Sequence, residues 1–474
     1  MLGPLEVLMS VAIQLLDKQS AKSVIDYGLF LGADFVELFV EKTQNQSIKI
    51  LNSKVDDIGG GVDFGIGIRL VYGPKVLYGF TNNPTEEELK KIVMTLATTD
   101  KKSGLKTLSD FTTKDLAIIH KASLSLHNAY PLDAKIQWLM SLDKATRTVS
   151  DKIVQVVSSS MQKCQQVEIF NSEGLHISEE RNYIRIMGQA VAQDGTEQSS
   201  GYDAPGALRG WEFTDALNPN QLGELVGKQA MTKLNAASCP AGRMPVIIDN
   251  AFGGVIFHEA CGHLLETTSV AKKASVFHDK MDTLIANPCV SAVDDGTIEN
   301  EWGSISIDDE GMETQKTQLI KNGVLTSFMV DKMGAQKTGF ARTGSGRRQS
   351  YRFAPASRMR NTFIEAGHST LEEMISTVKD GIYCKKMGGG SVQPGTGEFN
   401  FNAQESYLIK NGKIEKPIKS ATLISTGPEV LKQISMVGNN FALAAGMCGS
   451  VSGSVPTTVG QPAIKVDDIL VGGR

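Results

Sequence analysis

The sequence predicts an α+β protein, with a mixed α/β N-terminal domain at residues 1–238 and a β-rich C-terminal domain at residues 239–474. Three observations favour this fold class. The chain has 474 residues, too many for a single hydrophobic core, and suggests two or three domains. Glycine contributes 47 of the 474 residues, roughly a tenth of the chain against a usual share of about 7%. This excess favours turns and β-structure. Strand-like and helix-like patterns are also segregated rather than strictly alternating.

The N-terminal domain begins with an expected amphipathic helix at residues 5–31. Charges interrupt its apolar run, so it does not resemble a signal peptide. Residues 33–42 and 46–61 then alternate apolar and polar side chains, as half-buried strands do. Residues 64–83 predict a hairpin whose turn is "YGPK".

The second part of this domain returns to helices. Thr85 is a suitable N-cap for a helix at residues 85–99, which opens with acidic residues. A long helical pattern occupies residues 132–163, and strands joined by turns follow at residues 165–202. Another helix is predicted at residues 219–237, and a domain boundary near 238–244 closes this half.

The C-terminal domain is rich in predicted strands and glycine turns. The apolar strand "PVIIDN" at residues 245–250 immediately precedes the segment that carries the candidate chemistry. The pentapeptide "LIKNG" occurs at residues 319–323 and again at 408–412, and we expect a hairpin turn at both places.

Charge and cysteine usage narrow the function classes. The formal net charge of −4 predicts no general attraction to nucleic acid or to anionic membranes. No apolar run reaches the ~18 residues that a membrane span needs. The six cysteines form no CxxC pair and no dense framework, so we expect free thiols and a cytoplasmic location.

The most informative stretch is "GGVIFHEACGHLLE", residues 253–266. His258 and His263 are five residues apart, and a regular helix turning ~100° per residue would direct them ~140° apart. One small ion could not bind both side chains in that arrangement. A π-bulge or a kink would bring them together, and Gly262 lies where such an irregularity would be tolerated.

Glu259 follows the first histidine directly, where its carboxylate could take a proton from a metal-activated water. Metalloproteases use such a His-Glu pair, but with the second histidine four residues after the first rather than five. A histidine pair at this spacing is more often incidental, and the motif lacks a third ligand. Cys261, Glu266 or a distant residue could supply that ligand.

The same residues resemble a known family. "FHEACGHLLE" is similar to the HExxxH signature of the TldD/TldE (PmbA) metalloprotease family, in its catalytic TldD type. Further similar segments are "DDEGMETQKTQLIKNGVL", "GRRQSYRFAPASRMRNTFIEAG" and the C-terminal turn "GMCG". The resemblance extends over nearly the whole chain.

The resemblance implies a zinc site formed by His258, His263 and Cys448, with Glu259 as general base. It implies a cytoplasmic zinc peptidase that hydrolyses unfolded or short peptides inside a closed dimer cleft. The partner would be a TldE/PmbA-type subunit in a heterodimer, or a second copy in a homodimer. Neither nucleic acid nor membrane is expected as a partner. The alternative function is a non-proteolytic binding or regulatory protein of the gyrase-modulator type, with a structural metal site.

Other candidate residues receive weaker assignments. Cys261 is expected to be a packing residue, and the remaining histidines to be surface or locally hydrogen-bonded residues. The Arg-rich segment 346–361 predicts either a solvated loop or a strand that contacts substrate. A glycine-rich stretch beginning at residue 387 suggests an edge that a peptide backbone can approach. The residues assigned to substrate binding are Arg347, Arg348, Tyr351, Gly389 and Gly390.

Overall fold

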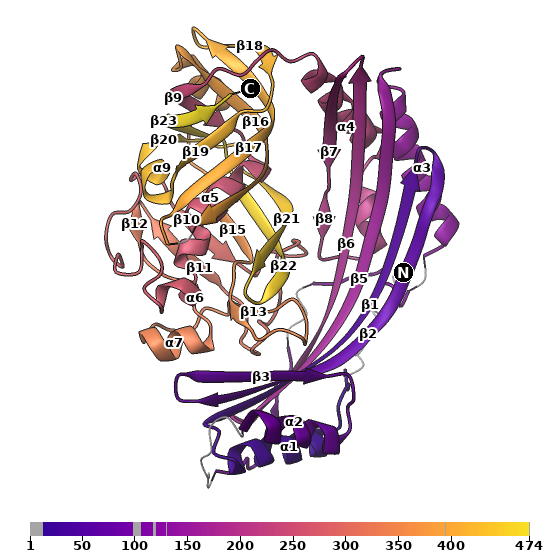
Figure 1. The fold of residues 1–474 in the computed structure, drawn as a ribbon, viewed down its shortest axis with the longest axis vertical. Helices are drawn as coiled ribbons and strands as arrows, with labels where there is room; N and C mark the ends of the chain where they lie inside the picture. The colour runs from indigo at the N-terminus through magenta and orange to yellow at the C-terminus, as the bar shows by residue number, and fades with distance from the viewer. Residues whose placement is uncertain (1–12, 98–105, 117–119, 129, 394, 474) are drawn as a thin grey trace, which may run out of the picture.

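The computed structural model describes residues 13–97, 106–116, 120–128, 130–393 and 395–473. A curved sheet built before residue 238 stands beside a C-terminal half that begins with β9 (Gly242–Ile248) (Figure 1). The described residues combine helices with many strands, and the C-terminal half is predominantly β. The predicted α+β class is therefore confirmed.

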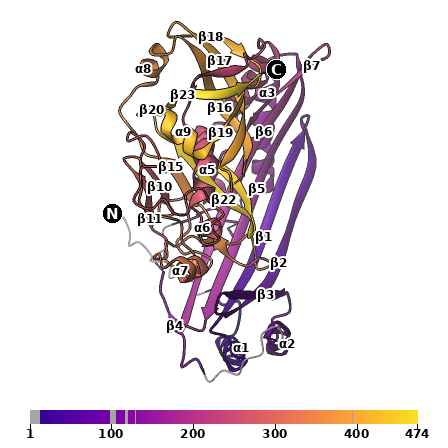
Figure 2. The same cartoon turned by 60° about the vertical axis from the view of Figure 1, so that its left-hand side comes forward.

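Four very long antiparallel strands form the N-terminal sheet. They are β1 (Phe35–Leu51), β2 (Lys54–Tyr72), β5 (Ile153–Asn171) and β6 (Leu175–Asp194), each of 17 to 20 residues. A typical strand has about 5–6 residues, so these strands run along most of the molecule, as Figure 2 shows. The sheet order is β3-β2-β1-β5-β6-β4, and β7 and β8 also pair with β6. The shorter strands are β3 (Lys75–Thr81), β4 (Thr112–Thr113), β7 (Glu197–Asp203) and β8 (Gly206–Ala207).

Two helix pairs cover this sheet at different places. At one end lie α1 (Lys18–Phe30) and α2 (Glu86–Ala97), packed on each other and on β1, β2 and β3 (Figures 1 and 2). Toward the other end lie α3 (Leu132–Arg147) and α4 (Pro219–Leu234). The helix expected from residue 5 begins at Lys18, where the Asp17 side chain accepts a hydrogen bond from the Ser20 amide. Residues 5–12 lie outside the described part of the chain.

The long helical pattern expected over residues 132–163 is wrong in its second half. Helix α3 ends at Arg147, and β5 begins at Ile153 as the strand between β1 and β6. Both faces of β5 are covered, and its polar side chains Ser158, Ser160 and Gln162 are buried. A strand covered on both faces need not alternate apolar and polar residues, so its period is not visible in the sequence.

Two large sheets and the two-stranded sheet β13-β14 build the C-terminal half. One large sheet has the order β16-β9-β23-β19-β17-β18 with β20 beside β23, and the other has the order β12-β11-β10-β15-β22-β21. Both predicted "LIKNG" hairpin turns are confirmed, between β11 and β12 and between β17 and β18. The strands are β10 (Ala292–Asp295), β11 (Lys316–Lys321), β12 (Val324–Leu325), β13 (Gly346–Arg347), β14 (Ala356–Ser357), β15 (Asn361–Ile364), β16 (Asp380–Gln393), β17 (Glu398–Lys410), β18 (Lys413–Ile418), β19 (Thr422–Thr426), β20 (Ile434–Val437), β21 (Ala442–Ser450), β22 (Gly453–Gln461) and β23 (Ile464–Gly472). The helices are α5 (Val255–Ala260), α6 (Thr267–Val270), α7 (Lys332–Thr338), α8 (Leu371–Ser376) and α9 (Gly427–Gln433).

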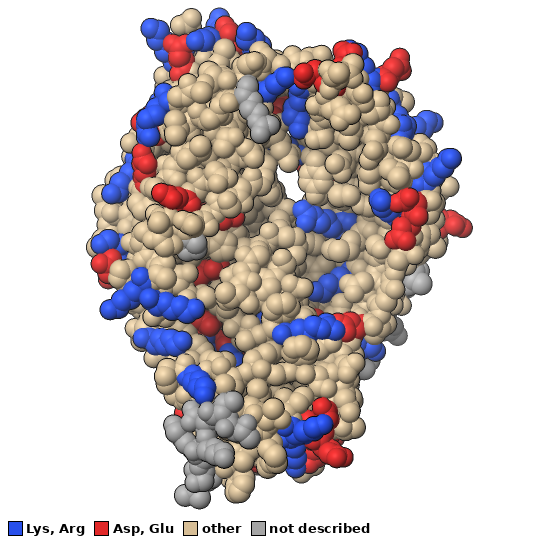
Figure 3. Space-filling model, in the orientation of Figure 1, with Lys and Arg blue, Asp and Glu red and all other residues tan. Residues whose placement is uncertain are grey.

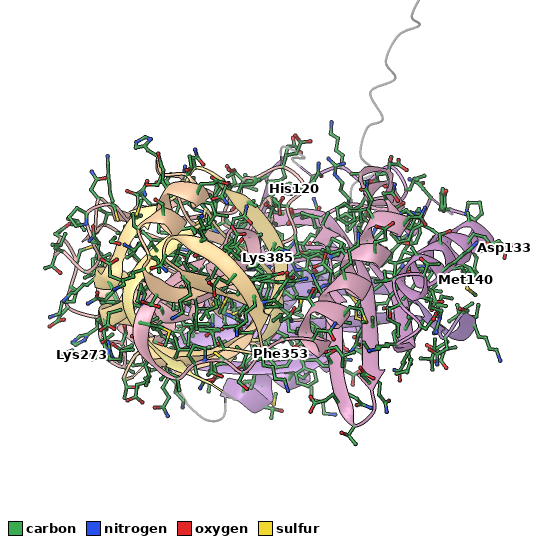
Figure 4. All side chains as sticks on the ribbon, turned by 90° about the horizontal axis from the view of Figure 1, so that it is seen from above. His120, Asp133, Met140, Lys273, Phe353 and Lys385 are labelled. Carbon is green, nitrogen blue, oxygen red and sulfur yellow. The ribbon has the colours of Figure 1, made fainter. Side chains whose placement is uncertain are left out.

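Buried ion pairs join the two halves. Arg69 on β2 pairs with Glu37 on β1 and with Glu310 of the C-terminal half, each at 2.5 Å. Arg181 on β6 reaches Asp309 at 2.7 Å. Figure 3 shows that the face of Figure 1 is hollowed between the halves, with Lys and Arg side chains along the hollow. Seen from above, Asp133 and Met140 of α3 lie at the edge opposite the C-terminal half (Figure 4).

Candidate metal centre

The helix that carries the His-Glu pair is interrupted before the second histidine. Helix α5 ends at Ala260, Cys261 adopts φ −133° and ψ −49°, and a 3-10 turn covers Gly262–Leu265. The predicted irregularity is therefore confirmed as a break at Cys261. The break redirects the chain so that His258 and His263 face each other, with ring centroids 5.0 Å apart.

Gly262 has a different role from the one expected. A Cβ atom at this position would lie 2.2 Å from Sδ of Met359, far inside van der Waals contact. Its backbone has no positive φ, and the distorted residue is Cys261. Glycine is therefore required because Met359 packs against the turn, and not because its backbone adopts a left-handed conformation.

Three ligand-type atoms converge at this break. Sγ of Cys448, on β21, lies 3.2 Å from Nε2 of His258 and 3.3 Å from Nε2 of His263. All three atoms lie within 4.8 Å of one another, and the three residues are buried. Cys448 is 185 residues from His263, and the pairing of β21 with β22 carries it to the site.

The geometry and chemistry of these atoms fit a metal ion. Ligand atoms 2.0–2.3 Å from one tetrahedral zinc ion lie about 3.3–3.6 Å from one another. The two His–Cys distances are close to that range without any rearrangement. The Nδ1 atom of His258 is buried and has no hydrogen-bond partner within the described chain.

The charges and hydrogen bonds around Cys448 favour its thiolate form. Burial alone would raise the pKa of Cys448, but the charge of His258 and hydrogen bonds from His258 and His263 lower it to about 3. Burial opposes charge on His263, yet the carboxylate of Glu266 and the contact with Cys448 hold the pKa of His263 well above its ordinary value. These shifts favour the thiolate form of Cys448 and the protonated form of His263.

Glu259 stands beside the three ligand atoms. Its Oε2 lies 3.9 Å from Nε2 of His263, beyond hydrogen-bond distance. Burial raises the pKa of Glu259, and the neighbouring histidines partly offset that rise. A half-buried carboxylate of raised pKa beside a candidate metal site is the kind of group that general-base catalysis uses.

Two further residues support the ligands. Oε2 of Glu266 is 3.1 Å from Nδ1 of His263, while the Nε atom of Arg358 is 3.8 Å from the other carboxylate oxygen. Arg358 also donates to the backbone carbonyl of Cys448 and to Oγ of Ser452. The buried Arg358 thus contacts both Glu266, the partner of His263, and the backbone of Cys448. Sequence reasoning left Glu266 open as a ligand and did not single out Arg358, although it lies in the noted Arg-rich segment.

The Arg-rich segment is not a solvated loop, so that expectation is wrong. Arg347 and Arg348 are buried. Arg347 donates to the Met359 carbonyl, and Arg348 donates to Glu37 and to the Asp309 carbonyl, each at 2.6 Å. Arg348 and Arg360 are buried against Glu37 and Asp294, acidic partners from distant parts of the chain. Arg352 of the same segment is exposed. The assignment of Arg347 and Arg348 to peptide binding stays a prediction.

The other substrate candidates occupy two places. Tyr351 is buried against the N-terminal sheet, where its amide donates to Glu41 and its hydroxyl lies 3.2 Å from Asp63. Gly389 and Gly390 are exposed on β16, a strand that contacts α5. Their role in peptide binding stays a prediction.

The remaining cysteine and histidine expectations agree with the structure. Cys261 is fully buried in the core of the C-terminal half, as a packing residue should be. His176 is buried but hydrogen-bonded, with Nε2 2.8 Å from Glu168 and Nδ1 2.9 Å from Thr113. His120 is also buried, and its Nδ1 accepts from the Asn300 amide.

The buried His-His-Cys cluster with an adjacent glutamate is the arrangement expected of a candidate metal centre. Sequence models of the PmbA/TldA metallopeptidase match in three parts: domain 1 over residues 36–95, the central domain over 127–234 and the C-terminal domain over 241–473. The chain therefore belongs to the PmbA/TldD metallopeptidase family.

Relatives of similar length support this placement. The chain is 34% identical over 468 residues to the metalloprotease TldD homolog of Haemophilus influenzae, covering 97% of both chains. It is 26% identical to the zinc metalloprotease TldD homolog of Saccharolobus solfataricus, covering 94% of this chain and 97% of that one.

Solved structures share the fold. TldE from Thermococcus kodakarensis superposes with a TM-score of 0.75 at 18% identity, covering 96% of this chain and all of that one. A putative modulator of a DNA gyrase from Thermotoga maritima gives a TM-score of 0.75 at 19% identity, covering 92% and 96%. In the described part of the chain, no helix is long and apolar enough to cross a membrane.

Proposed function

We propose that this protein is a zinc metallopeptidase that hydrolyses unfolded or short peptides, with zinc held by His258, His263 and Cys448. The observation that carries the proposal is the convergence of three buried ligand atoms beside the carboxylate of Glu259. Two imidazoles, one thiolate and an adjacent carboxylate leave room for substrate and water, which suits a catalytic site better than a closed structural one.

Bound zinc would polarise the scissile carbonyl and lower the pKa of the attacking water. Glu259 takes the proton from that water and later passes it to the leaving amine. Its raised pKa brings proton uptake closer to neutral pH, where a general base is most effective. Glu266 and Arg358 keep His263 and Cys448 in position during the cycle. An arginine or tyrosine of residues 347–352 is the proposed donor to the oxyanion.

The peptide would add as an extended strand along β16. That strand pairs with β9 only over Ile382–Cys384, so from residue 385 onward its β9-side edge has no strand partner in the described chain. Gly389 and Gly390 lie on this stretch, where the absence of side chains lets another backbone approach closely. Main-chain hydrogen bonds along such an edge give broad sequence tolerance.

The partner would be a TldE/PmbA-type subunit, with a homodimer as the alternative. The hollow between the two halves would then be closed by the partner, which would limit substrates to short or unfolded chains (Figure 3). Membership of the PmbA/TldD family supports a partner of that type. The gyrase-modulator alternative rests on neighbours under 20% identical, a likeness that extends to the fold alone.

The test is peptide digestion followed by mass spectrometry, using the purified chain alone and with a co-expressed TldE-type subunit. We expect cleavage of unfolded peptides, its loss after chelation and its return on adding zinc. A metal-loaded complex that cleaves no member of a diverse peptide library would favour the binding-protein alternative.

A further inference from the structure

A second group of metal-ligand side chains lies on the N-terminal sheet, away from the centre described above. Cys164 of β5 is 2% exposed, and its Sγ lies 3.2 Å from Nε2 of His127. The same nitrogen is 3.8 Å from Oε2 of Glu180, on β6. The three ligand atoms lie within 4.8 Å of one another.

These residues face away from the C-terminal half. Gln162, two residues before Cys164, hydrogen-bonds Lys135 of α3 at 2.5 Å. Side chains two residues apart on a strand share a face, so Cys164 lies on the face covered by α3. Gln165, on the opposite face, hydrogen-bonds Glu41 at 2.7 Å, and Glu41 accepts from the amide of Tyr351 in the C-terminal half. The sheet therefore separates this group from the centre at His258.

Each of the three residues is held in place by its own surroundings. Cys164 is opposite Asn182 in the β5–β6 register, which puts Glu180 two residues along on the same face. The two carboxylate oxygens of Glu180 accept from Gln166 at 2.9 Å and from Asn182 at 3.0 Å. Second-sphere amides of this kind orient a metal-binding carboxylate.

The segment that carries His127 is anchored independently of the histidine. The amides of Ser123 and Leu124 donate to the carboxylate of Glu212 at 3.1 and 2.9 Å. The carbonyl of Leu124 accepts from the amide of Trp211 at 2.9 Å. His127 is therefore presented to β5 and β6 by a fixed turn, so a metal would meet a largely formed site.

We propose that His127, Cys164 and Glu180 form a second transition-metal site, which takes zinc or a similar divalent ion. One imidazole, one cysteine sulfur and one carboxylate suit zinc, whereas Mg²⁺ and Ca²⁺ prefer oxygen ligands alone. Burial and the charge of Glu180 raise the pKa of Cys164 to about 12, so the metal must displace the thiol proton on binding. The Cys164–His127 and His127–Glu180 distances of 3.2 and 3.8 Å lie on either side of the ~3.3–3.6 Å expected around a tetrahedral ion. The His–Cys distance equals the 3.2 Å between His258 and Cys448 at the candidate centre.

This site has an approach from solvent and a structural role. His127 is 44% exposed and Glu180 33% exposed, so an ion reaches the buried thiol between them. An adjacent pocket is bordered by Leu126 and by residues 44–46 of β1 and 59–62 of β2. Bound metal would tie the segment 120–128 to the β5–β6 hairpin.

The test uses cobalt(II) as a probe, because thiolate-bound Co²⁺ gives a charge-transfer absorption band. The background is the full chain carrying His258→Ala and Cys448→Ser, which removes the first centre. We expect a thiolate–cobalt band that saturates at one equivalent and is bleached by Zn²⁺. The band should be lost in Cys164→Ser. Cys289→Ser removes an exposed cysteine outside the cluster and is the matched control.

His127→Ala and Glu180→Gln test whether the cobalt is bound at this site even if the buried Cys164→Ser variant fails to fold. Both residues are partly exposed, so their replacement should leave the fold intact. Each should weaken Co²⁺ binding by more than about tenfold. The absence of any thiolate–cobalt band in the background would overturn the proposal. Unchanged affinity in both His127→Ala and Glu180→Gln would also overturn it.

Discussion

Replacing Gly262 by alanine tests how the chain accommodates two histidines five residues apart. The added Cβ would lie 2.2 Å from Sδ of Met359, whereas ordinary contact between such atoms is about 3.5–4.0 Å. The sulfur must therefore move by more than about 1 Å. Met359 is fully buried, and overpacking of this kind costs about 1–3 kcal/mol. Because Met359 follows Arg358, which bonds the Cys448 carbonyl, zinc affinity should fall as well.

The assay is a double-mutant cycle measured by denaturant unfolding. Met359→Ala alone should destabilise by about 2–5 kcal/mol, since it leaves a cavity. In the double variant the new methyl group enters that cavity, so the two costs should fall short of additivity by at least about 1 kcal/mol. Gly61→Ala is the control, because a Cβ there meets nothing within 4 Å. Additive costs, or a Gly262→Ala variant as stable as the control, would refute the packing role of this glycine.

Three further predictions concern the metal ligands. Cys448→Ser should sharply reduce the amount of bound zinc, because a hydroxyl is a much poorer ligand than a thiolate. Cys261→Ser, at a buried packing residue, should keep the zinc. The reverse result would mean that the wrong sulfur has been assigned. Zinc affinity should rise with pH, because His263 must lose its proton to bind. The raised pKa of His263 extends that proton competition to higher pH than for an ordinary imidazole. Titrations at several pH values should therefore show Glu266→Gln, which removes the carboxylate that raises this pKa, moving the loss of binding to lower pH. Arg358→Lys should weaken zinc binding by about 10–100-fold by losing its bond to the Cys448 carbonyl, and wild-type affinity in a competition assay would remove Arg358 from the support of the site.

The local features of the site could be predicted from the sequence because they depend on neighbouring residues. The spacing of His258 and His263 required an irregular helix, and the structure breaks it at Cys261. The contact that makes Gly262 necessary could not be foreseen, because Met359 lies almost a hundred residues further along the chain. Cys448 was likewise reachable only through the family resemblance, since spacing alone cannot bring β21 to α5.

The fold was predictable where caps, turns or apolar runs mark an element, and not where a strand buries polar side chains. Helix α2 and the "LIKNG" turns follow from capping and turn residues. Strand β5 was misread because its central position buries polar side chains such as Ser158 and Ser160. The Arg-rich segment was also ambiguous, because the carboxylate that buries Arg348 belongs to Glu37, at the other end of the chain.

The most direct test of the central claim is to measure zinc content and peptide hydrolysis on one sample of Glu259→Gln. Glu259 is proposed as the base and not as a ligand, so the variant should retain zinc in the wild-type amount. Hydrolysis should fall by about 10²–10⁴-fold, the usual contribution of a general base. Loss of zinc together with activity would make Glu259 part of the metal site, and full activity with zinc retained would contradict the proposed mechanism.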